Sequence, residues 1–209
     1  MSLDVRTAGT SALMLTFGSL AEAVAFRAGL RSTTAVSGVT EVVSGARTLL
    51  VRFDPHATDA VRLRAALADV RPREIGPSGS GEAVVVPVTY DGEDLEEVAR
   101  LAGTTPAALV AWHTGQVWTS AFCGFAPGFS YLTGSAPSLD VPRRSTARTA
   151  VPSGSVGLAG GFSAVYPRTS PGGWQLIGRT DVPMWSVDRD PPALAPAGTL
   201  VRFVDVGAA

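Results

Sequence analysis

The stretch FCGFAPGFSYLTG, residues Phe122–Gly134, decides the class of fold because it is apolar and yet full of chain-bending residues. It holds three glycines, one proline, three phenylalanines and a tyrosine, and it carries no charge. Glycine and proline at this density interrupt regular structure, whereas aromatic side chains suit the half-buried surface of a strand. The stretch is therefore predicted to be the end of a strand followed by a loop.

The chain from Gln116 onward continues in the same manner. Short apolar or alternating pieces recur between prolines and glycines, and none has convincing helical spacing. These pieces are QVWTSAF, SVGLAG, SAVYP, WQLIG and TLVRFVDV. Two short helices are expected before them, in residues 92–103 and 104–115. Residues 81–209 are thus predicted to form a second domain, an all-β closed barrel with these helices at its start.

Residues 1–80 are predicted to form a small α/β sandwich of the ferredoxin-like type, which makes the whole chain an α+β protein. Strands are expected in residues 12–18, 39–45 and 46–54, and amphipathic helices in residues 19–32 and 58–70. A strand in residues 82–90 completes the order β-α-β-β-α-β, although it can join either domain. The segment RPREIGPSGSG, residues 71–81, is predicted to be the linker.

The composition excludes several classes of function. A net charge of −1 gives no reason to expect nucleic acid or an anionic membrane as a partner. The chain has no lysine, which excludes Schiff-base chemistry and a phosphate-binding P-loop of its own. One cysteine and two histidines allow no internal disulfide and make a metal site unexpected. Since the start of the chain lacks a signal-peptide pattern, we expect a cytoplasmic protein.

Arginine is concentrated in the part of the chain with the most irregular loops. Residues 98–180 contain six arginines and a single acid, Asp140. Arg143, Arg144 and Arg148 precede the turn of Ser153, Gly154 and Ser155 in the segment PRRSTARTAVPSGS. Because guanidinium groups pair with two oxygens at once, this arrangement predicts an anion clamp beside backbone N–H groups. The alternative is a solvated basic loop.

A second segment, YPRTSPGGWQLIGRT in residues 166–180, is predicted to form another wall of the same pocket. Gly172 and Gly173 fix a sharp reversal, and Trp174 then supplies a flat surface between Arg168 and Arg179. The alternative is an ordinary turn with a tryptophan in the core. His113 is a candidate general base or ligand, or else a positive charge at a helix C-terminus.

Two nucleophilic arrangements are considered and not favoured. A hydrolase triad of Ser153 or Ser155 with His113 and Asp140 lacks the G-x-S-x-G turn that positions such a serine. A thiol pair of Cys123 with His113 places the cysteine in an apolar, strand-like setting, which disfavours the reactive thiolate.

Three blocks in order, GFAPGFSYLTG, PRRSTARTAVPSGSVGLAGG and YPRTSPGGWQLIGRT, resemble the allophanate hydrolase subunit 1 family, which is also known as the KipI-like family or as the B subunit of 5-oxoprolinase. The upstream segment VTYDGEDLEEVARLAGTTPAALVAWHTGQVW is similar to its lead-in. The resemblance implies a C-terminal cyclophilin-like barrel after a small α/β domain. It also implies a complex with a homologous second subunit (allophanate hydrolase subunit 2-like) and a third subunit, which opens 5-oxoproline to glutamate at the expense of ATP.

The resemblance also guides the choice of site residues for a small carboxylate or amide substrate. Arg143, Arg148 and Arg179 are expected to stabilise anionic charge, with His113 as a proton carrier. The expected substrate-binding residues are Phe125, Pro127, Gly128, Phe129, Tyr131, Ser153, Gly154, Ser155, Tyr166, Gly172, Gly173 and Trp174. ATP is expected in the complex, bound by a partner subunit or at an interface. The sequence departs from the family pattern at Glu93 and Ala147, where proline is common.

Two other functions remain open under the same resemblance. A KipI-type inhibitor of a histidine kinase would use the barrel as a binding surface. A carboxyltransferase-like subunit, related to domains of urea carboxylase, would work with a biotinylated partner, because a chain without lysine cannot carry biotin itself.

Overall fold

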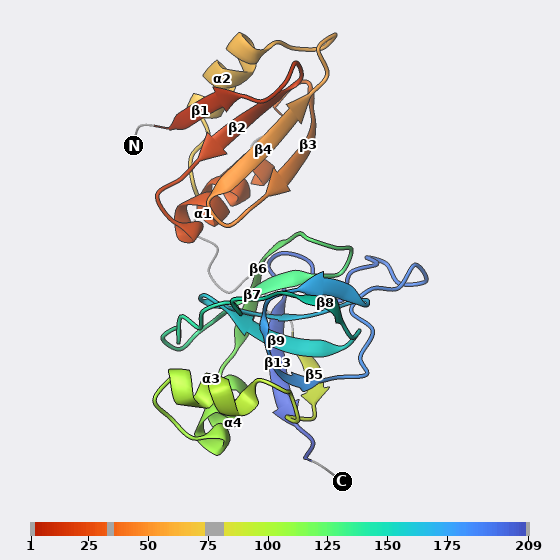
Figure 1. Ribbon diagram of the computed structural model, residues 1–209. Coiled ribbons are helices and arrows are strands. Elements are labelled where there is room, and N and C mark those ends of the chain that lie inside the picture. The colour runs from red at the N-terminus through yellow and green to blue at the C-terminus, as the bar shows by residue number, and fades with distance from the viewer. Residues whose placement is uncertain (1–2, 33–35, 74–81, 208–209) are drawn as a thin grey trace. The chain divides into compact units, whose positions relative to one another are not determined.

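The computed structural model describes residues 3–32, 36–73 and 82–207. The chain divides into two compact units, Met1–Gly76 and Pro77–Ala209 (Figure 1). The predicted domain boundary between residues 80 and 81 lies outside the described residues.

The N-terminal unit is a four-stranded antiparallel sheet with two helices. Its elements are β1 (Asp4–Thr7), β2 (Ala12–Thr16), α1 (Leu20–Ser32), β3 (Val39–Ser44), β4 (Thr48–Phe53) and α2 (Ala60–Ala68). The sheet order is β1-β2-β4-β3. Alternate residues of the two central strands, such as Leu13 and Val51, pack against Phe26 of α1 and Leu63 of α2. This two-layer core confirms the predicted α/β sandwich.

The last strand of the predicted order β-α-β-β-α-β, which the sequence allowed in either domain, does not lie in this sheet. The strand predicted in residues 82–90 is β5 (Val84–Val88), and it belongs to the barrel, where Val86 and Val88 are fully buried. The edge of the N-terminal sheet beside β2 is formed instead by β1. The four residues of β1, DVRT, are mostly exposed and polar, so they carry no apolar alternation that a sequence pattern can detect.

The C-terminal unit is a seven-stranded, nearly closed barrel of mixed direction. Its strands, in sheet order, are β12 (Gln175–Arg179), β9 (Ser155–Ala159), β10 (Phe162–Val165), β7 (Ser130–Gly134), β6 (Trp118–Cys123), β13 (Leu200–Asp205) and β5. Thr89, just after β5, forms an antiparallel bridge with Arg179, with 2.9 Å N–H···O bonds in both directions. This bridge brings the two edges of the sheet together. A two-stranded sheet of β8 (Arg148–Val151) and β11 (Ser170–Gly172) accompanies the barrel.

The two predicted helices before the barrel are confirmed as α3 (Leu95–Leu101) and α4 (Pro106–Thr114). They pack together, with α3 against β12 and α4 against β13 (Figure 1). The Thr105 hydroxyl accepts a hydrogen bond from the Ala108 N–H and so caps α4. Within the described residues, no helix is both long and apolar enough to cross a bilayer.

Candidate functional site

The signature blocks meet in a cluster of aromatic side chains beside the barrel. Phe129 contacts Tyr166 and Trp174 edge to face, with ring centroids 5.3 and 5.4 Å apart. Tyr131 joins from β7, 5.6 Å from Trp174, and stacks on Phe122 at 4.3 Å. Phe129, Tyr166 and Trp174 are almost completely buried, whereas Tyr131 is only partly so. The predicted apolar wall therefore exists, and segments distant in the chain build it together.

Gly172 allows this cluster to close. A Cβ at this position would lie 2.3 Å from the Tyr166 hydroxyl oxygen and 3.0 Å from two carbons of its ring. Burial raises the pKa of Tyr166 and outweighs the opposing effects of a backbone hydrogen bond at Trp174 and the charge of Arg143. The Tyr166 phenol is therefore neutral at physiological pH and serves as a polar atom within an apolar wall.

Phe125 lies at the outer rim of the cluster in a strained backbone conformation. Its φ is +67°, and the Ala126 N–H donates to the Gly124 carbonyl at 2.8 Å across it. This γ-turn with positive φ is rare and costly for a residue with a side chain. The ring is 57% exposed while its edge contacts Phe129 and Tyr166. The fold thus holds an aromatic ring at the surface directly above the buried cluster.

The loop that carries Phe125 packs closely against Met184 and Trp185 at Gly128. Gly128 has a φ of +83°, and a Cβ there would lie 2.8 Å from the Cβ of Trp185 and 2.9 Å from the Met184 carbonyl oxygen. Only glycine suits both the backbone angle and the close approach. Pro127, between Phe125 and Gly128, is exposed.

A buried carboxylate, Asp94, organises the arginines beside the cluster. Its Oδ1 accepts hydrogen bonds from Arg144 Nη1 at 2.5 Å and Arg148 Nη2 at 2.9 Å, and its Oδ2 accepts from the Leu176 N–H at 2.7 Å. Burial by itself raises the pKa of Asp94. The hydrogen bonds from Arg148 and Leu176, together with the two arginine charges, outweigh burial and leave this pKa below its usual range. Asp94 is thus ionised and permanently engaged.

Arg148 links this ion cluster to the aromatic wall. Its Nη1 approaches the Trp174 carbonyl oxygen at 3.5 Å, and its Nη2 also donates to Glu93 Oε2 at 2.9 Å. The predicted clamp is therefore not a set of free guanidinium groups, because Arg144 and Arg148 already have carboxylate partners. Arg143 is exposed and makes no hydrogen bond or ion pair with the part of the chain that the structure describes.

At Gly154 and Ser155, the backbone N–H groups of the predicted anion clamp are engaged in hydrogen bonds within the chain. The Gly154 N–H donates to the Tyr166 carbonyl at 2.8 Å, and the Ser155 N–H donates to the Pro152 carbonyl at 3.3 Å. The Ser153 hydroxyl donates to the Pro167 carbonyl at 3.1 Å. These groups hold the start of β9 in place, so they are not available to a ligand.

Arg179 does not join the other predicted catalytic arginines. Its Nε donates to Asp91 Oδ2 at 2.8 Å, and its backbone forms the bridge that closes the barrel. It lines a separate cavity of about 350 Å³ with Pro87, Asp181 and Pro183. Arg179 and Arg148 pair with different acids, Asp91 and Asp94, and this arrangement does not support the prediction that they act on one ligand.

The placement of His113 argues against its predicted role as a proton carrier. The side chain is fully buried, with Nδ1 2.6 Å from the Tyr90 hydroxyl and Nε2 2.9 Å from the Ser163 hydroxyl. Its ring stacks on Phe203 at 4.4 Å. Burial lowers the pKa of His113 to about 3, so the ring is neutral. It is therefore not a cationic helix cap either, but a polar link between α4 and the barrel core.

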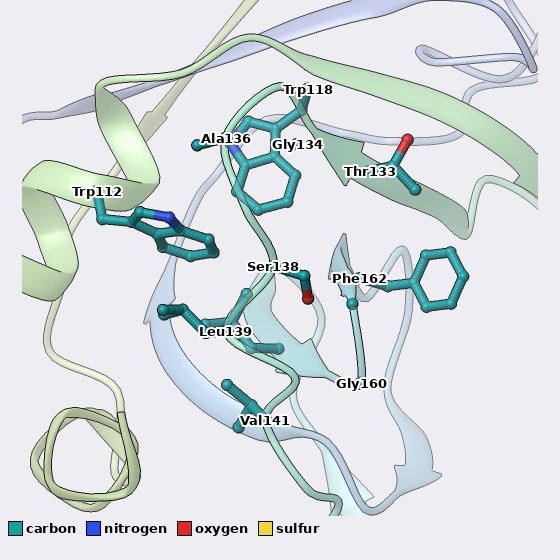
Figure 2. Close-up of a pocket in the computed structure, with 12 residues that line it drawn as sticks. Trp112, Trp118, Thr133, Gly134, Ala136, Ser138, Leu139, Val141, Gly160 and Phe162 are labelled. Atoms are coloured by element: carbon teal, nitrogen blue, oxygen red, sulfur yellow. The ribbon is translucent and has the colours of Figure 1, made fainter. Parts of the chain in front are cut away.

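A small apolar cavity of about 230 Å³ lies beside the aromatic cluster (Figure 2). The indoles of Trp112 and Trp118 form one side, and Phe162 and Thr133 lie across from them, with Ser138 between. Phe162 also contacts the Tyr131 ring at 5.6 Å, which places the cavity next to the cluster. Among the described residues, those that line it are all uncharged.

Sequence reasoning missed Asp94 and this cavity. Asp94 stands in an acidic run, GEDLEE, where nothing distinguishes it from solvent-exposed carboxylates. The one signal in the sequence is that Asp94 directly precedes the predicted helix, a position that suits an N-cap. In the structure its carboxylate makes no cap hydrogen bond and binds the arginines instead.

Comparison with known proteins places these features in a family. The family model for the carboxyltransferase domain, subdomain C and D, matches residues 3–195. The chain is 42% identical over 130 residues to a Haemophilus influenzae protein named as the B subunit of 5-oxoprolinase, and the match covers 61% of each chain. It is 43% identical over 126 residues to a Bacillus subtilis protein of the same name, covering 59% of this chain and 52% of the relative. The matches thus span little more than half of each relative.

Solved structures share the fold. TTHA0988 superposes with a TM-score of 0.76 at 32% identity, covering 99% of this chain and 41% of that longer one. An uncharacterised conserved protein of Pyrococcus horikoshii, PH0987, matches over 98% of both chains with 28% identity and a TM-score of 0.57. The K. lactis urea amidolyase gives a TM-score of 0.73 over 98% of this chain and 15% of its own, at 17% identity, which shows likeness of fold alone.

Proposed function

The chain belongs to the carboxyltransferase domain family of subdomains C and D, and from this premise we propose that it is one subunit of an ATP-dependent 5-oxoprolinase, as the names of its relatives suggest. In this role it acts with a homologous second subunit and a third subunit to hydrolyse the lactam of 5-oxoproline to glutamate.

The observation that carries the proposal is the meeting of an aromatic wall with guanidinium groups. 5-Oxoproline has a small ring with an apolar side, an amide and one carboxylate. Phe125 and Tyr131 offer a surface for the ring, while Arg148 lies at its edge and exposed Arg143 is a further cation for the carboxylate. Arg148 reaches the Trp174 carbonyl, and the Arg144 N–H donates to the Gly173 carbonyl at 2.8 Å, which brings the segment with the neighbouring Arg143 to the same turn. Guanidinium groups are well suited to a planar carboxylate.

We assign this chain the binding and orientation of the substrate. The described residues of the cluster present no free base or nucleophile, since His113 lies inside the barrel core. Holding the lactam in one orientation lowers the entropic part of the barrier, whichever subunit attacks it.

The described residues do not fit an ATP site made by this chain alone. The sequence contains no lysine and therefore no P-loop lysine. The N–H groups of Gly154 and Ser155 are also occupied. We therefore place ATP on a partner subunit or at an interface, and we derive no phosphoryl-transfer step through this chain.

The test is reconstitution with the subunits encoded by neighbouring genes. Glutamate release from 5-oxoproline is measured with and without ATP, and with this chain left out. The proposal requires release that depends on both. An assembled complex that releases no glutamate would overturn it.

A second candidate is a carboxyltransferase-like role, which the description of the family model favours. Because the chain has no lysine, biotin would have to arrive on a partner protein. Carboxyl transfer from a biotinylated partner to urea, in the absence of 5-oxoproline, would distinguish this function from the first.

A further inference from the structure

We propose that Glu93 occupies the ligand position of Arg148 and is displaced when an anionic substrate binds, so that Glu93 sets the affinity of the site for carboxylates. This inference rests on the proposed function in one respect, which is that the ligand brings a carboxylate to the aromatic wall. It assigns to Glu93 a role in specificity and not in the chemical step.

The two carboxylates on Arg148 differ in how firmly they are held. Asp94 is 5% exposed and is fixed by Arg144 and the Leu176 N–H as well as by Arg148. The side chain of Glu93 is 77% exposed, and Arg148 is the one partner that the described residues provide for it. Asp94 is therefore a permanent partner, whereas Glu93 can leave without exposing a buried group.

The charges favour replacement of Glu93 by another anion. Arg144 and Arg148 together carry two positive charges, and Asp94 neutralises one of them. Glu93 neutralises the other. When Glu93 swings into solvent, the cluster regains a positive charge that a ligand carboxylate can neutralise. Arg143, which is exposed and precedes Arg144 in the chain, is available as a second donor. An ion pair with so exposed a partner contributes little to stability, so the exchange is inexpensive.

The backbone on both sides of Glu93 is held independently of its side chain. The Gly92 N–H donates to the Ile177 carbonyl at 3.3 Å, and the Asp94 N–H donates to the Leu176 carbonyl at 2.9 Å. A Cβ at Gly92 would lie 2.3 Å from the Leu176 carbonyl oxygen, which shows how closely this loop follows β12. Changing the Glu93 side chain is therefore expected to leave the loop in place.

The experiment compares Glu93→Gln with a matched control. Glu97→Gln removes the same charge on the adjacent helix, where Glu97 pairs with Arg100 at 2.6 Å and not with Arg148. Binding of L-5-oxoproline to the assembled complex is measured by calorimetry. The neutral analogue 2-pyrrolidinone, which keeps the lactam and lacks the carboxylate, serves as the second probe. Thermal midpoints of all variants verify folding.

We expect Glu93→Gln to bind 5-oxoproline about two- to fivefold more tightly at low salt, as expected for loss of a competing exposed ion pair. This gain is expected to shrink at high ionic strength. Glu97→Gln should bind 5-oxoproline with the same affinity as the wild type. The affinity for 2-pyrrolidinone should be the same in all three proteins. Unchanged or weaker binding of 5-oxoproline by Glu93→Gln overturns the inference, and so does the absence of measurable binding to both proteins.

The outcomes separate this inference from the proposed function. If the wild-type complex releases no glutamate but Glu93→Gln still gains affinity for 5-oxoproline, the oxoprolinase proposal fails and the displacement of Glu93 stands. If glutamate release is normal and the Glu93 variant behaves like the Glu97 control, only the present inference fails.

Discussion

The carboxylate of Asp94 and the guanidinium of Arg148 meet at 2.9 Å and join the start of α3 to β8. Arg148 is itself only 15% exposed, so the pair lies largely out of water. Its position matters for function because the same guanidinium faces the Trp174 carbonyl of the aromatic wall. The ion pair thus sets where the positive edge of the candidate site lies.

Replacing Asp94 by asparagine is expected to destabilise the C-terminal unit. The change leaves two arginines without their shared carboxylate, and breaking a largely buried pair of this kind costs about 3–5 kcal/mol. Urea unfolding of the variant measures the loss. Glu97→Gln, which removes an exposed ion pair, should cost less than ~1 kcal/mol. Equal losses of unfolding free energy in the two variants would show that the buried ion cluster stabilises the fold no more than an exposed ion pair does.

His113 predicts a distinct dependence of stability on pH. Its pKa is about 3 in the folded chain, whereas an unfolded histidine has a pKa of about 6.5. Between these values the unfolded state binds a proton that the folded state does not, so the free energy of unfolding falls as the pH falls. The contribution of this group is about 1.4 kcal/mol per pH unit between pH 6 and pH 4.

The measurement is the free energy of unfolding at pH 6, 5 and 4 for the wild type and His113→Asn. The variant loses the hydrogen bonds of His113 at every pH. The change of its free energy of unfolding with pH should be smaller than that of the wild type by about 1.4 kcal/mol per pH unit. His56→Asn, a change at an exposed position, is the matched control for the loss of an imidazole. A slope that His113→Asn does not alter would contradict the burial of a neutral ring.

Phe125 is expected to matter for substrate more than for stability. Phe125→Ala removes the exposed ring but keeps a Cβ in the positive-φ conformation, and Phe125→Gly removes the strain as well. The glycine variant should therefore be about 1 kcal/mol more stable than the alanine variant, as measured by thermal unfolding. Both variants should lower glutamate release about tenfold or more, since the ring is the outer wall of the site.

Assembly with the partner subunits, followed by gel filtration, separates two explanations for this loss of activity. An intact complex supports contact between Phe125 and substrate. A complex that no longer forms would instead make Phe125 a residue of the subunit interface.

The close approach of Gly172 and Tyr166 predicts a coupling between them. Gly172→Ala forces a methyl group against the phenol and should cost about 1–3 kcal/mol. Tyr166→Phe removes the oxygen that the methyl group would meet first, so the same glycine change should cost less in that background. The ring carbons at 3.0 Å still resist it, so we expect partial and not complete relief. A double-mutant cycle with additive effects would contradict the geometry.

The sequence was sufficient for the elements whose signal is local. The helix at Pro106–Thr114 has its cap and its early proline next to each other in the chain, and the barrel strands have apolar pieces between glycines and prolines. The aromatic wall was predicted because its residues lie in blocks that resemble one family. These are features that a short window or a motif can contain.

The sequence was not sufficient where the partners lie far apart in the chain. Asp94 pairs with Arg148, and no local pattern distinguishes it from Glu96 or Glu97. The position of His113 at a helix end is typical of a helix-terminal charge. Its contacts with Phe203 and Ser163, which bury it, come from segments far away in the chain. The surplus of positive charge in residues 98–180 predicts arginines free to bind anions, but the acids that neutralise Arg148 and Arg179 lie just before that range, at Asp94 and Asp91.

The parallel pairing of β5 with β13 has a consequence for how the chain folds during synthesis. Val84 pairs with Val201, so one of the first strands of the barrel waits for the last before its hydrogen bonds form. The N-terminal sheet, built from neighbouring segments, has no such delay. Topologies dominated by distant pairings fold slowly. While the ribosome is still translating the later strands, β5 has a valine-rich edge without its strand partner, the kind of edge that favours pairing with other chains.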